Sequence, residues 1–243
     1  MLKPITTINF LKHQNIKKKD NLNILCWNVA KLTKDRSFNQ FFNQLIKDEK
    51  IDYLILQEVK SEIIHNSDFF RDFSFILSAN MQTKKHIYGV MNGFKIFCQS
   101  QQNLLTSKKE LKLATHKSVL ITKHTLNNKE ILIVNVHALN FVFFNDFKYE
   151  LGKLKEILKN YKGTLIVAGD FNTWNRKRVS FLKAFCEELF LEEVSYMQSN
   201  NIKKVFKNSI DYIFFRGLRL QYSKVIDTNK ISDHNPIVAS FTI

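Results

Sequence analysis

Glycine, proline and long apolar runs are scarce in this sequence. The 243 residues include six glycines and two prolines, which excludes a low-complexity linker, and no internal repeat divides the chain. Hydrophobic residues make up 44% and charged residues 24%, as in ordinary globular domains and unlike disordered or collagen-like chains. No apolar run approaches the roughly 18–20 residues of a membrane span, so we expect no transmembrane segment. The N-terminal segment also lacks the apolar stretch of a secretory signal peptide.

Cysteine is also rare. Cys26, Cys98 and Cys186 are odd in number, widely spaced and without a CxxC pair, which argues against a disulfide framework and against a zinc knuckle. Free thiols of this kind are typical of buried positions in proteins of reducing compartments, so we expect a cytoplasmic protein. We further expect a monomer, with a basic arm at residues 1–20, loose or in a short helix, followed by a single domain at residues 21–243.

Acidic residues are few relative to basic ones. The chain has 37 Lys and Arg against 22 Asp and Glu, which gives a formal net charge of +15 and a pI of about 9.6. Such a charge favours anionic partners: nucleic acid, an anionic membrane surface or a phosphorylated small molecule. A lysine-rich genome would explain the preference for Lys over Arg better than it explains the excess of base over acid. We therefore favour an anionic partner.

Short apolar runs rich in Ile, Val and Phe alternate with helical patterns. Residues 22–29 and 51–57 are typical of buried strands, and the apolar residues from Phe38 to Ile46 repeat with the spacing of one helix face. Two more helices are predicted around residues 147–158 and 179–189. The other strand candidates are residues 73–78, 86–97, 117–123, 130–136, 164–169, 210–215, 219–226 and 236–242. The early strand–helix–strand order favours parallel pairing and the later run of strands antiparallel pairing, so we predict a layered α/β domain with mixed pairing.

Polar residues of a particular kind stand at the ends of these strands. They are Asn28, Glu58, His137, Asp170, Asn172, Asp211, Asp233 and His234. Each one alone has a simpler explanation, such as a solvated charge or a turn cap. Their recurrence at successive strand ends is much harder to explain by turn chemistry, and ligands bind at such edges of α/β sheets. The sequence therefore predicts one site that collects these side chains.

The acidic residues and one histidine suit hydrolysis of a phosphate ester with a divalent metal. Glu58, Asp170 and Asp233 offer the oxygen ligands that Mg²⁺ prefers. A cation on a non-bridging phosphate oxygen would offset the negative charge that repels an attacking water. His234 can accept a proton from that water near neutral pH. No serine or cysteine is placed as a nucleophile, so we expect direct attack by water.

The remaining polar residues have supporting roles in the same chemistry. Asp211 could orient the imidazole that accepts the proton and stabilise its charged form. His137 could donate a proton or a hydrogen bond to a phosphoryl oxygen. Asn28 and Asn172 offer neutral amides that fix ligands without adding charge.

Several motifs in this order resemble one known superfamily. They are CWNV, LQE, NVHALN, AGDFN, IDYIF and SDHNP. Together they resemble the endonuclease/exonuclease/phosphatase superfamily, the group of deoxyribonuclease I and exonuclease III, from about residue 22 to the C-terminus. Within it, VNVHALNF, AGDFNTWNRKR and DYIFFRGL are most similar to the bacterial YafD-like subgroup. The resemblance implies a four-layer α/β sandwich, with two mixed β-sheets packed face to face and flanked by helices. It also implies Mg²⁺- or Mn²⁺-dependent cleavage of phosphodiesters or phosphomonoesters.

The resemblance also assigns roles to individual residues. Glu58 resembles the main metal ligand, with Asn28 beside it. Asp233 resembles a second carboxylate on the metal side. Asp170 and Asn172 resemble the pair that orients water and phosphate.

The histidines and one alanine refine the comparison. His234 with Asp211 resembles the His–Asp dyad of the superfamily. His137 matches the first histidine of the deoxyribonuclease I and sphingomyelinase branches, where repair enzymes of the exonuclease III type usually carry Tyr. Ala30 stands where the repair branch commonly has an Asp ligand. These two differences move the chain away from abasic-site endonucleases and weaken a second-metal proposal.

We favour a metal-dependent nuclease that acts on DNA. Arg176, Lys177 and Arg178 directly follow GDFNTWN. Cations in the first turn of a helix oppose the helix dipole, so their placement favours contacts with backbone phosphates, although they could equally reach solvent. Lys117 precedes a strand and could point at the same edge. We therefore predict Lys117, Arg176 and Arg178 as phosphate-binding residues.

Two other functions use the same sequence features. The alternative substrate is an inositol phosphate, a phospholipid or another small phosphoester, docked by the basic surface. Phe141, Phe143 and Phe144 follow the HALN turn and could stack on bases or enter a membrane, but we prefer to place them in the core under a loop. A binding module without activity is disfavoured, because all the expected carboxylates and both histidines are present.

Overall fold

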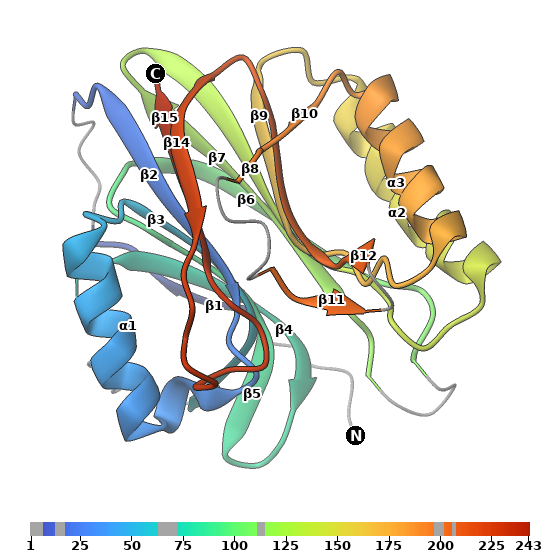
Figure 1. The fold of residues 1–243 in the computed structure, drawn as a ribbon, viewed down its shortest axis with the longest axis horizontal. Helices are drawn as coiled ribbons and strands as arrows, with labels where there is room; N and C mark the ends of the chain where they lie inside the picture. Colours follow the sequence, from blue (N-terminus) through green and yellow to red (C-terminus); the bar gives the residue numbers. More distant parts are fainter. Residues whose placement is uncertain (1–6, 13–17, 63–71, 111–114, 197–201, 206–207) are drawn as a thin grey trace.

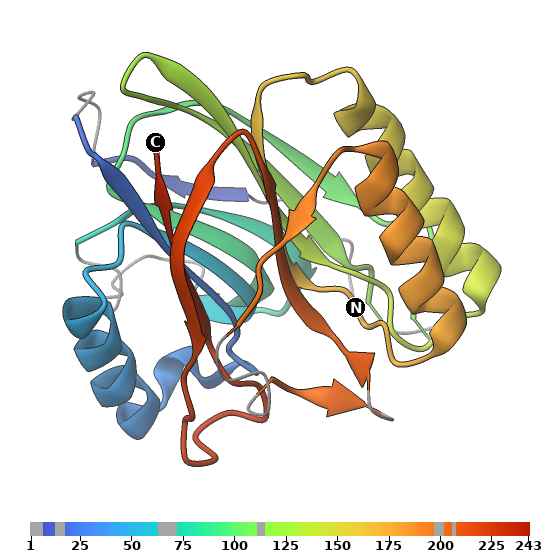
Figure 2. The same cartoon turned by 45° about the horizontal axis from the view of Figure 1, so that its top comes forward.

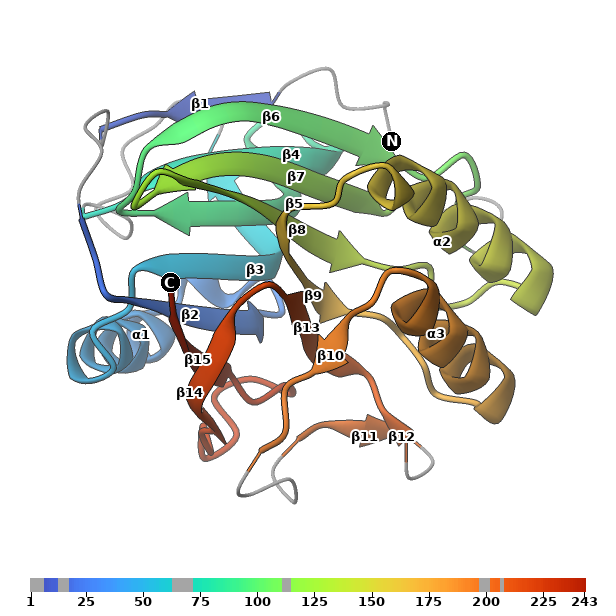
Figure 3. The ribbon, with the colours of Figure 1, turned by 90° about the horizontal axis from the view of Figure 1, so that it is seen from above.

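The computed structural model describes residues 7–12, 18–62, 72–110, 115–196, 202–205 and 208–243. Two mixed β-sheets pack face to face, with helices on their outer sides (Figures 1 and 3). The seven-stranded sheet contains, in spatial order, β1 (Thr7–Phe10), β4 (Ser74–Gln82), β5 (His86–Phe94), β3 (Tyr53–Glu62), β2 (Asn21–Asn28), β15 (Ile237–Thr242) and β14 (Arg219–Val225). The six-stranded sheet contains β10 (Glu192–Glu193), β13 (Asp211–Arg216), β9 (Thr164–Asp170), β8 (Lys129–His137), β7 (Ser118–Leu126) and β6 (Cys98–Leu105).

The helices complete the predicted four layers. Helix α1 (Arg36–Asp48) covers the outer face of the seven-stranded sheet, and helices α2 (Phe144–Lys159) and α3 (Arg176–Glu188) cover that of the six-stranded sheet (Figure 1). A short 3-10 helix, η1 (Leu32–Lys34), precedes α1. The hairpin of β11 (Lys204–Val205) and β12 (Asn208–Ser209) lies outside both sheets (Figure 2). The predicted sandwich is therefore confirmed.

Strand pairing follows the prediction, whereas several edge strands were missed. All ten predicted strands and all three predicted helices form. Strands β2 and β3 are parallel, as are β8 and β9, while β9–β13 and β14–β15 are antiparallel. Strand β6 escaped prediction because its sequence, CQSQQNLL, is polar and mostly exposed at a sheet edge. The expectation of a loose or helical arm is wrong for Thr7–Phe10, which pairs with β4.

Alternating side chains divide the core into three parts. Leu22 and Ile24 of β2 pack with Ile166 of β9 in the layer between the sheets. Leu25 and Trp27 point to the other side of β2, toward α1. This alternation arises because successive strand residues face opposite sides of a sheet. Because these strands are buried on both faces, their sequences are nearly continuous apolar runs.

The helix faces match the predicted apolar spacing. In α1, Phe38 and Phe42 are buried against Trp27, with the Trp27 and Phe38 ring centroids 4.8 Å apart. The carboxylate of Asp35 caps the helix by accepting a hydrogen bond from the Phe38 amide at 2.9 Å, as N-cap residues commonly do. The segment between the two parallel strands therefore returns across the outer face of the sheet.

A chain of buried polar side chains runs between the two sheets. Asn135 of β8 donates from Nδ2 to the Leu56 and Met91 carbonyls, and its Oδ1 accepts from Gln57 Nε2 at 2.8 Å. The Tyr53 hydroxyl lies 3.1 Å from Nε2 of His124. These bonds satisfy polar groups inside an otherwise apolar layer and fix one sheet relative to the other.

The pairing register brings the functional ends of the strands together. Because β2 and β3 run parallel, Asn28 ends beside Gln57. His137 pairs with Asp170 in β8–β9, and Asp170 pairs with Asp211 in β9–β13. Gly169 allows β9 its close approach to β8, because a Cβ there would lie 1.9 Å from the Val136 carbonyl oxygen and its φ is 141°.

His124 makes the stability of the fold depend on pH. Its Nδ1 donates to the Phe97 carbonyl at 3.0 Å, and burial lowers the pKa of His124 from 6.5 to about 3. The unfolded chain therefore binds a proton at this site below its ordinary pKa, whereas the folded protein does not. The stability supported by neutral His124 is complete above pH 6.5 and falls as the pH drops toward 3.

We expect the parent protein to lose about 2 kcal/mol more unfolding free energy between pH 7 and pH 5 than the His124→Gln variant. Urea unfolding at the two pH values measures this difference. His86→Gln is the matched control, since His86 is partly exposed and its replacement should keep the parental pH dependence. Equal pH dependence in all three proteins would contradict the assignment.

Candidate active site

The aligned strand ends form one cavity of about 440 Å³. Asn28 Nδ2 donates to Asp170 Oδ2 at 3.0 Å, a bond between residues from the two different sheets. Eight of the predicted residues line the cavity: Asn28, Glu58, Lys117, His137, Asp170, Asn172, Asp233 and His234. Asp211 lies directly behind, hydrogen-bonded to His234. The other lining residues are Asn140, Phe141, Trp174, Lys203 and Ile210. Sequence reasoning had not assigned Asn140, Trp174 and Ile210 to the site although they lie within the quoted motifs, and no motif marks Lys203.

Asp170 is the buried centre of the cavity. Its Oδ1 accepts a hydrogen bond from the Asn172 amide at 3.0 Å, and its Oδ2 accepts from Asn28. Burial and the nearby charge of Asp211 raise the pKa of Asp170 to about 6. Asn172 has a positive φ of 50° and donates from Nδ2 to the Ala138 carbonyl at 3.0 Å. The turn after β9 is therefore tied to the end of β8.

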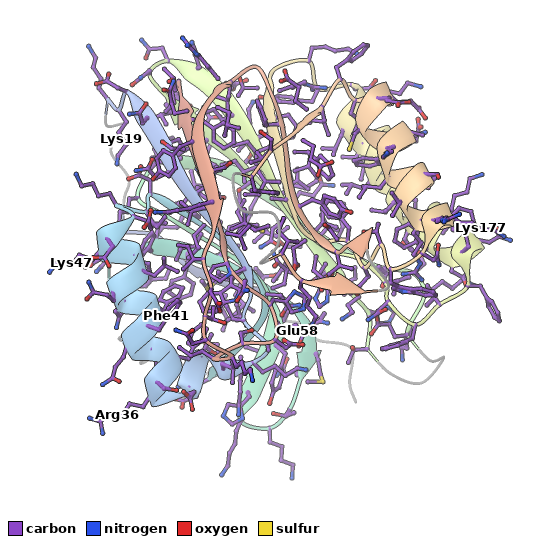
Figure 4. All side chains as sticks on the ribbon, viewed as in Figure 1. Lys19, Arg36, Phe41, Lys47, Glu58 and Lys177 are labelled. Carbon is purple, nitrogen blue, oxygen red and sulfur yellow. The ribbon has the colours of Figure 1, made fainter. Side chains whose placement is uncertain are left out.

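Glu58 reaches the cavity through an irregularity in β3. The register with β5 shifts between Leu56 and Val59, and Glu58 has a φ of 54°. Such a bulge re-aims a side chain, and strained backbone of this kind clusters at functional sites. Glu58 Oε2 lies 2.9 Å from Lys31 Nζ, and Oε1 lies 3.8 Å from His137 Nε2. Figure 4 shows Glu58 near the lower centre of the molecule.

His234 and Asp211 form a buried pair. His234 Nδ1 lies 2.7 Å from Asp211 Oδ2, so Nδ1–H donates to the carboxylate and Nε2 is directed toward Asp170, 3.9 Å away. The Trp27 indole donates to the His234 carbonyl at 2.8 Å and holds the loop in place. Burial lowers the pKa of His234, but the charge and hydrogen bond of Asp211 outweigh burial and raise the pKa above its ordinary value.

His137 has a different environment from the one expected. Lys117 Nζ lies 2.8 Å from His137 Nε2 and donates to it. Burial, followed by the charge of Lys117, holds the pKa of His137 well below its usual range. The imidazole is therefore neutral near pH 7 and serves as an acceptor, so the positive charge at this point of the cavity belongs to Lys117. Glu110 balances that charge at 3.6 Å.

Asp233 occupies the rim of the cavity. Its side chain is largely exposed, and its Oδ2 accepts a hydrogen bond from Lys203 Nζ at 2.5 Å. Burial raises the pKa of Asp233, but the bond and charge of Lys203 prevail and lower the pKa below its ordinary value. Asp233 is therefore an ionised carboxylate that is already paired with a lysine.

Three of these residues could hold a metal ion. The ligand atoms of Asp170, Asp211 and His234 lie within 4.8 Å of one another, and all three side chains are buried. Asp211 Oδ1 is also buried without a hydrogen-bond partner among the described residues. This group differs from the predicted ligands Glu58, Asn28 and Asp233, which line the same cavity and offer oxygen ligands alone.

The prediction that Arg178 binds phosphate is wrong. Its side chain is fully buried, and its guanidinium lies 4.4 Å from the ring centroid of Phe147. The two terminal nitrogens donate to four backbone carbonyls at 2.7–3.0 Å, those of Leu139, Asn140, Val142 and Asn172. Arg178 therefore joins the loop after β8 to the turn after β9. These hydrogen bonds explain, without any ligand, why a cation lies in the first turn of α3.

The neighbouring cations are exposed but do not line the cavity. Arg176 and Lys177 are exposed in the first turn of α3, and Lys177 lies at the right-hand edge of Figure 4, well apart from Glu58. Lys117 is the predicted phosphate-binding residue that the structure brings into the cavity.

The core assignment of the phenylalanine cluster is also wrong for two of its three residues. Phe141 is 62% and Phe143 is 81% exposed. Phe144 alone packs partly against the core of α2 and α3. Phe141 lines the cavity, so the loop after β8 presents aromatic surface at the site.

Comparison with known proteins agrees with this geometry. The Endonuclease/Exonuclease/phosphatase family matches residues 25–234, and the chain belongs to this family. A UPF0294 protein of Vibrio campbellii is 29% identical over an alignment 245 residues long, which covers 98% of this chain and 84% of that protein. A UPF0294 protein of Vibrio parahaemolyticus is 30% identical over an alignment 247 residues long, with the same coverage of 98% and 84%. These names do not mention the YafD-like subgroup, which stays a prediction.

Solved structures share the fold. An endonuclease/exonuclease/phosphatase family protein from Leptotrichia buccalis superposes with a TM-score of 0.69 at 18% identity, over 91% of this chain and 100% of that one. TDP2 of D. rerio, complexed with a single-strand DNA product, superposes with a TM-score of 0.66 at 14% identity, over 93% of this chain and 100% of that one. At these identities the likeness establishes the fold alone.

We expect Arg178→Ala to lower the unfolding free energy by about 3 kcal/mol or more, because it removes the donor from two buried and two partly buried carbonyls. Urea unfolding measures the change. Arg176→Ala removes an exposed arginine from the same helical turn and should stay within about 0.5 kcal/mol of the parent. If Arg178→Ala is too unstable to purify, Arg178→Lys should show an intermediate loss. Equal stability of the Arg178 and Arg176 variants would contradict the structural role.

Proposed function

We propose that this protein is a Mg²⁺- or Mn²⁺-dependent phosphoesterase that hydrolyses phosphodiester bonds of DNA by direct attack of water. The observation that carries the proposal is the convergence of Glu58, Asp170, His137 and the His234–Asp211 pair on one cavity. Family membership supports the same class of chemistry. These five residues come from β3, β8, β9, β13 and the loop after β14. Residues that only cap turns have no reason to converge in this way.

The donor set of the cavity fits a hard divalent cation. Glu58 and Asn28 supply carboxylate and amide oxygens beside buried Asp170, and Mg²⁺ prefers such oxygen ligands. We therefore assign the metal to Glu58 and Asn28, with Asp233 at the rim. In the alternative group, His234 Nδ1 and Asp211 Oδ2 already bond to each other at 2.7 Å. When bound, the cation offsets charge on a non-bridging phosphoryl oxygen.

The protein residues then divide the remaining work. Asp211 keeps a proton on Nδ1 of His234, so that Nε2 can take a proton from the attacking water. Asp170 and Asn172 orient that water and the phosphate from the turn after β9. Lys117 donates to a phosphoryl oxygen, and neutral His137 positions its ammonium group. This replaces the expected proton donation by His137.

DNA is the substrate that the charge favours. The chain carries a formal net charge of +15, and sequence-independent binding of nucleic acid depends on such charge. A fold relative, TDP2 of D. rerio, was solved with a single-strand DNA product. The exposed Phe141 and Phe143 keep a phospholipid as the second candidate, since aromatic side chains also enter membrane surfaces. Among the described residues, no helix is long and apolar enough to cross a membrane.

The protein's setting belongs to the same proposal. All three cysteines are free thiols, two of them buried, which supports a reducing, cytoplasmic location. We still predict that the protein is a monomer. We also still predict that it belongs to the YafD-like subgroup.

His234→Ala should lower Mg²⁺-dependent hydrolysis by at least about 100-fold, because it removes the proton acceptor. The assay follows plasmid DNA and bis-p-nitrophenyl phosphate, with and without the metal, and hydrolysis should vanish when the metal is chelated. His86→Ala, outside the cavity, is the control and should retain parental activity. A His234→Ala variant that cleaves as fast as the parent would refute the assignment.

Salt separates the two substrates. Binding to DNA should weaken linearly on a plot of log affinity against log salt concentration, because phosphate contacts release counterions. Titrations on DNA and on anionic phospholipid vesicles measure both partners under the same conditions. Tight binding to vesicles together with a flat salt response on DNA would favour the phospholipid.

A further inference from the structure

A second hollow, of about 940 Å³, adjoins the cavity. One wall is the loop after β8, with Phe141, Val142 and Phe143. The segment after β6 also lines this hollow, with Lys108 and Lys109. We call this hollow the aromatic groove. The proposed chemistry assigns no role to it.

The aromatic groove and the active-site cavity share lining residues. Phe141 and Trp174 line both of them. The backbone links them a second time, because His116 lines the groove and the next residue, Lys117, lines the cavity. A chain-like ligand whose phosphate lies between Lys117 and Glu58 would therefore have the groove next to it.

The aromatic wall is held rigidly although its rings are exposed. Arg178 donates to the Asn140 carbonyl at 2.7 Å and to the Val142 carbonyl at 3.0 Å, the residues on either side of Phe141. Phe143 is the N-cap of α2 and is 81% exposed. A large exposed ring normally gains from burial, so a loop that fixes two of them outward favours a role in recognition.

The groove also has a positive charge. Lys108 and Lys109 are exposed, and neither forms an ion pair among the residues that the structure describes. Asp146, in the first turn of α2, is the acidic residue of the lining, where it also favours the helix dipole. Two lysines and two phenylalanines in the lining of one hollow suit a ligand that alternates anionic and flat apolar groups.

We propose that the aromatic groove binds a single-stranded segment of nucleic acid next to the phosphate to be cleaved. Phe143 and Phe141 stack on unpaired bases, and Lys108 and Lys109 contact the backbone phosphates. The proposal rests on the proposed nuclease function, which places the phosphate to be cleaved in the neighbouring active-site cavity. It adds that the substrate is single-stranded next to that phosphate, and it names the residues that bind the unpaired segment.

The shape of the surface favours a strand over a membrane. The rings line a hollow that shares Phe141 and Trp174 with the cavity, whereas membrane-inserting side chains stand on projecting surfaces that a flat bilayer can reach. Stacking also explains the rings together with the lysines, because every unpaired base offers a flat face between two charged phosphates.

The test measures binding of a fluorescein-labelled oligothymidylate of about 12 nucleotides, a length within the site sizes of such grooves. Fluorescence anisotropy in the presence of EDTA reports affinity without cleavage. Phe143→Ala should weaken binding by at least about 5-fold, the effect of losing one stacked base. The Lys108→Ala, Lys109→Ala double variant should weaken binding and reduce its salt dependence.

Two matched controls exist in the same chain. Phe190 is 78% exposed and lines neither the groove nor the cavity. Phe190→Ala should therefore bind the oligonucleotide like the parent. Lys47 of α1 and Lys129 at the start of β8 are exposed, and their double alanine variant controls for loss of charge alone.

The outcomes separate this proposal from the proposed function. Parental affinity in Phe143→Ala, or an equal loss in Phe190→Ala, overturns the groove assignment. So does a Phe143→Ala variant that loses binding to phosphatidylserine vesicles but keeps its affinity for the oligonucleotide. Hydrolysis of bis-p-nitrophenyl phosphate by the parent is measured in parallel. If that hydrolysis is absent while oligonucleotide binding depends on Phe143, the proposed function fails and the groove remains a binding site.

Discussion

The structure of the site depends on how two sheets are packed against each other. The bond from Asn28 Nδ2 to Asp170 Oδ2, 3.0 Å long, joins the end of a strand in one sheet to the end of a strand in the other. It can form because Asn135 fixes the layer between the sheets through buried hydrogen bonds to carbonyls of the opposite sheet. A shift of one residue in either sheet would turn these side chains to the other face. The alignment of the sheets therefore decides whether a site exists at all.

Burial then gives these residues their chemical properties. Asp170 and His234 are both removed from water, and burial opposes the charged form of each. For His234 the partner Asp211 restores the charged form, whereas for His137 the nearby Lys117 disfavours it further. The pKa values of two histidines that look alike in the sequence are thus shifted in opposite directions. The difference comes from their neighbours, which belong to distant segments of the chain.

The cations near the site show the limits of local patterns. Arg176 and Arg178 stand two residues apart in the same helical turn, yet one is exposed and the other is fully buried. Both were predicted to bind phosphate, because the sequence indicates charge and helix position but not the carbonyls that the guanidinium will meet. Phe143 is the reverse case: its apolar side chain suggested the core, and the structure exposes it. The loop after β8 explains both cases, because its carbonyls accept hydrogen bonds from Arg178 and because it carries Phe143.

The sequence by itself determined the elements and the inventory of the site. Apolar spacing located ten strands and three helices, and polar residues at strand ends such as Glu58 and Asp170 marked the cavity, because periodicity and strand termination are local properties. Polar edge strands such as β6 lacked that signal. Only the tertiary structure decided that Lys117 pairs with His137, that Arg178 supports a loop and that Phe143 faces a groove. These facts depend on contacts between segments far apart in the chain, and no local pattern records which groups will meet there.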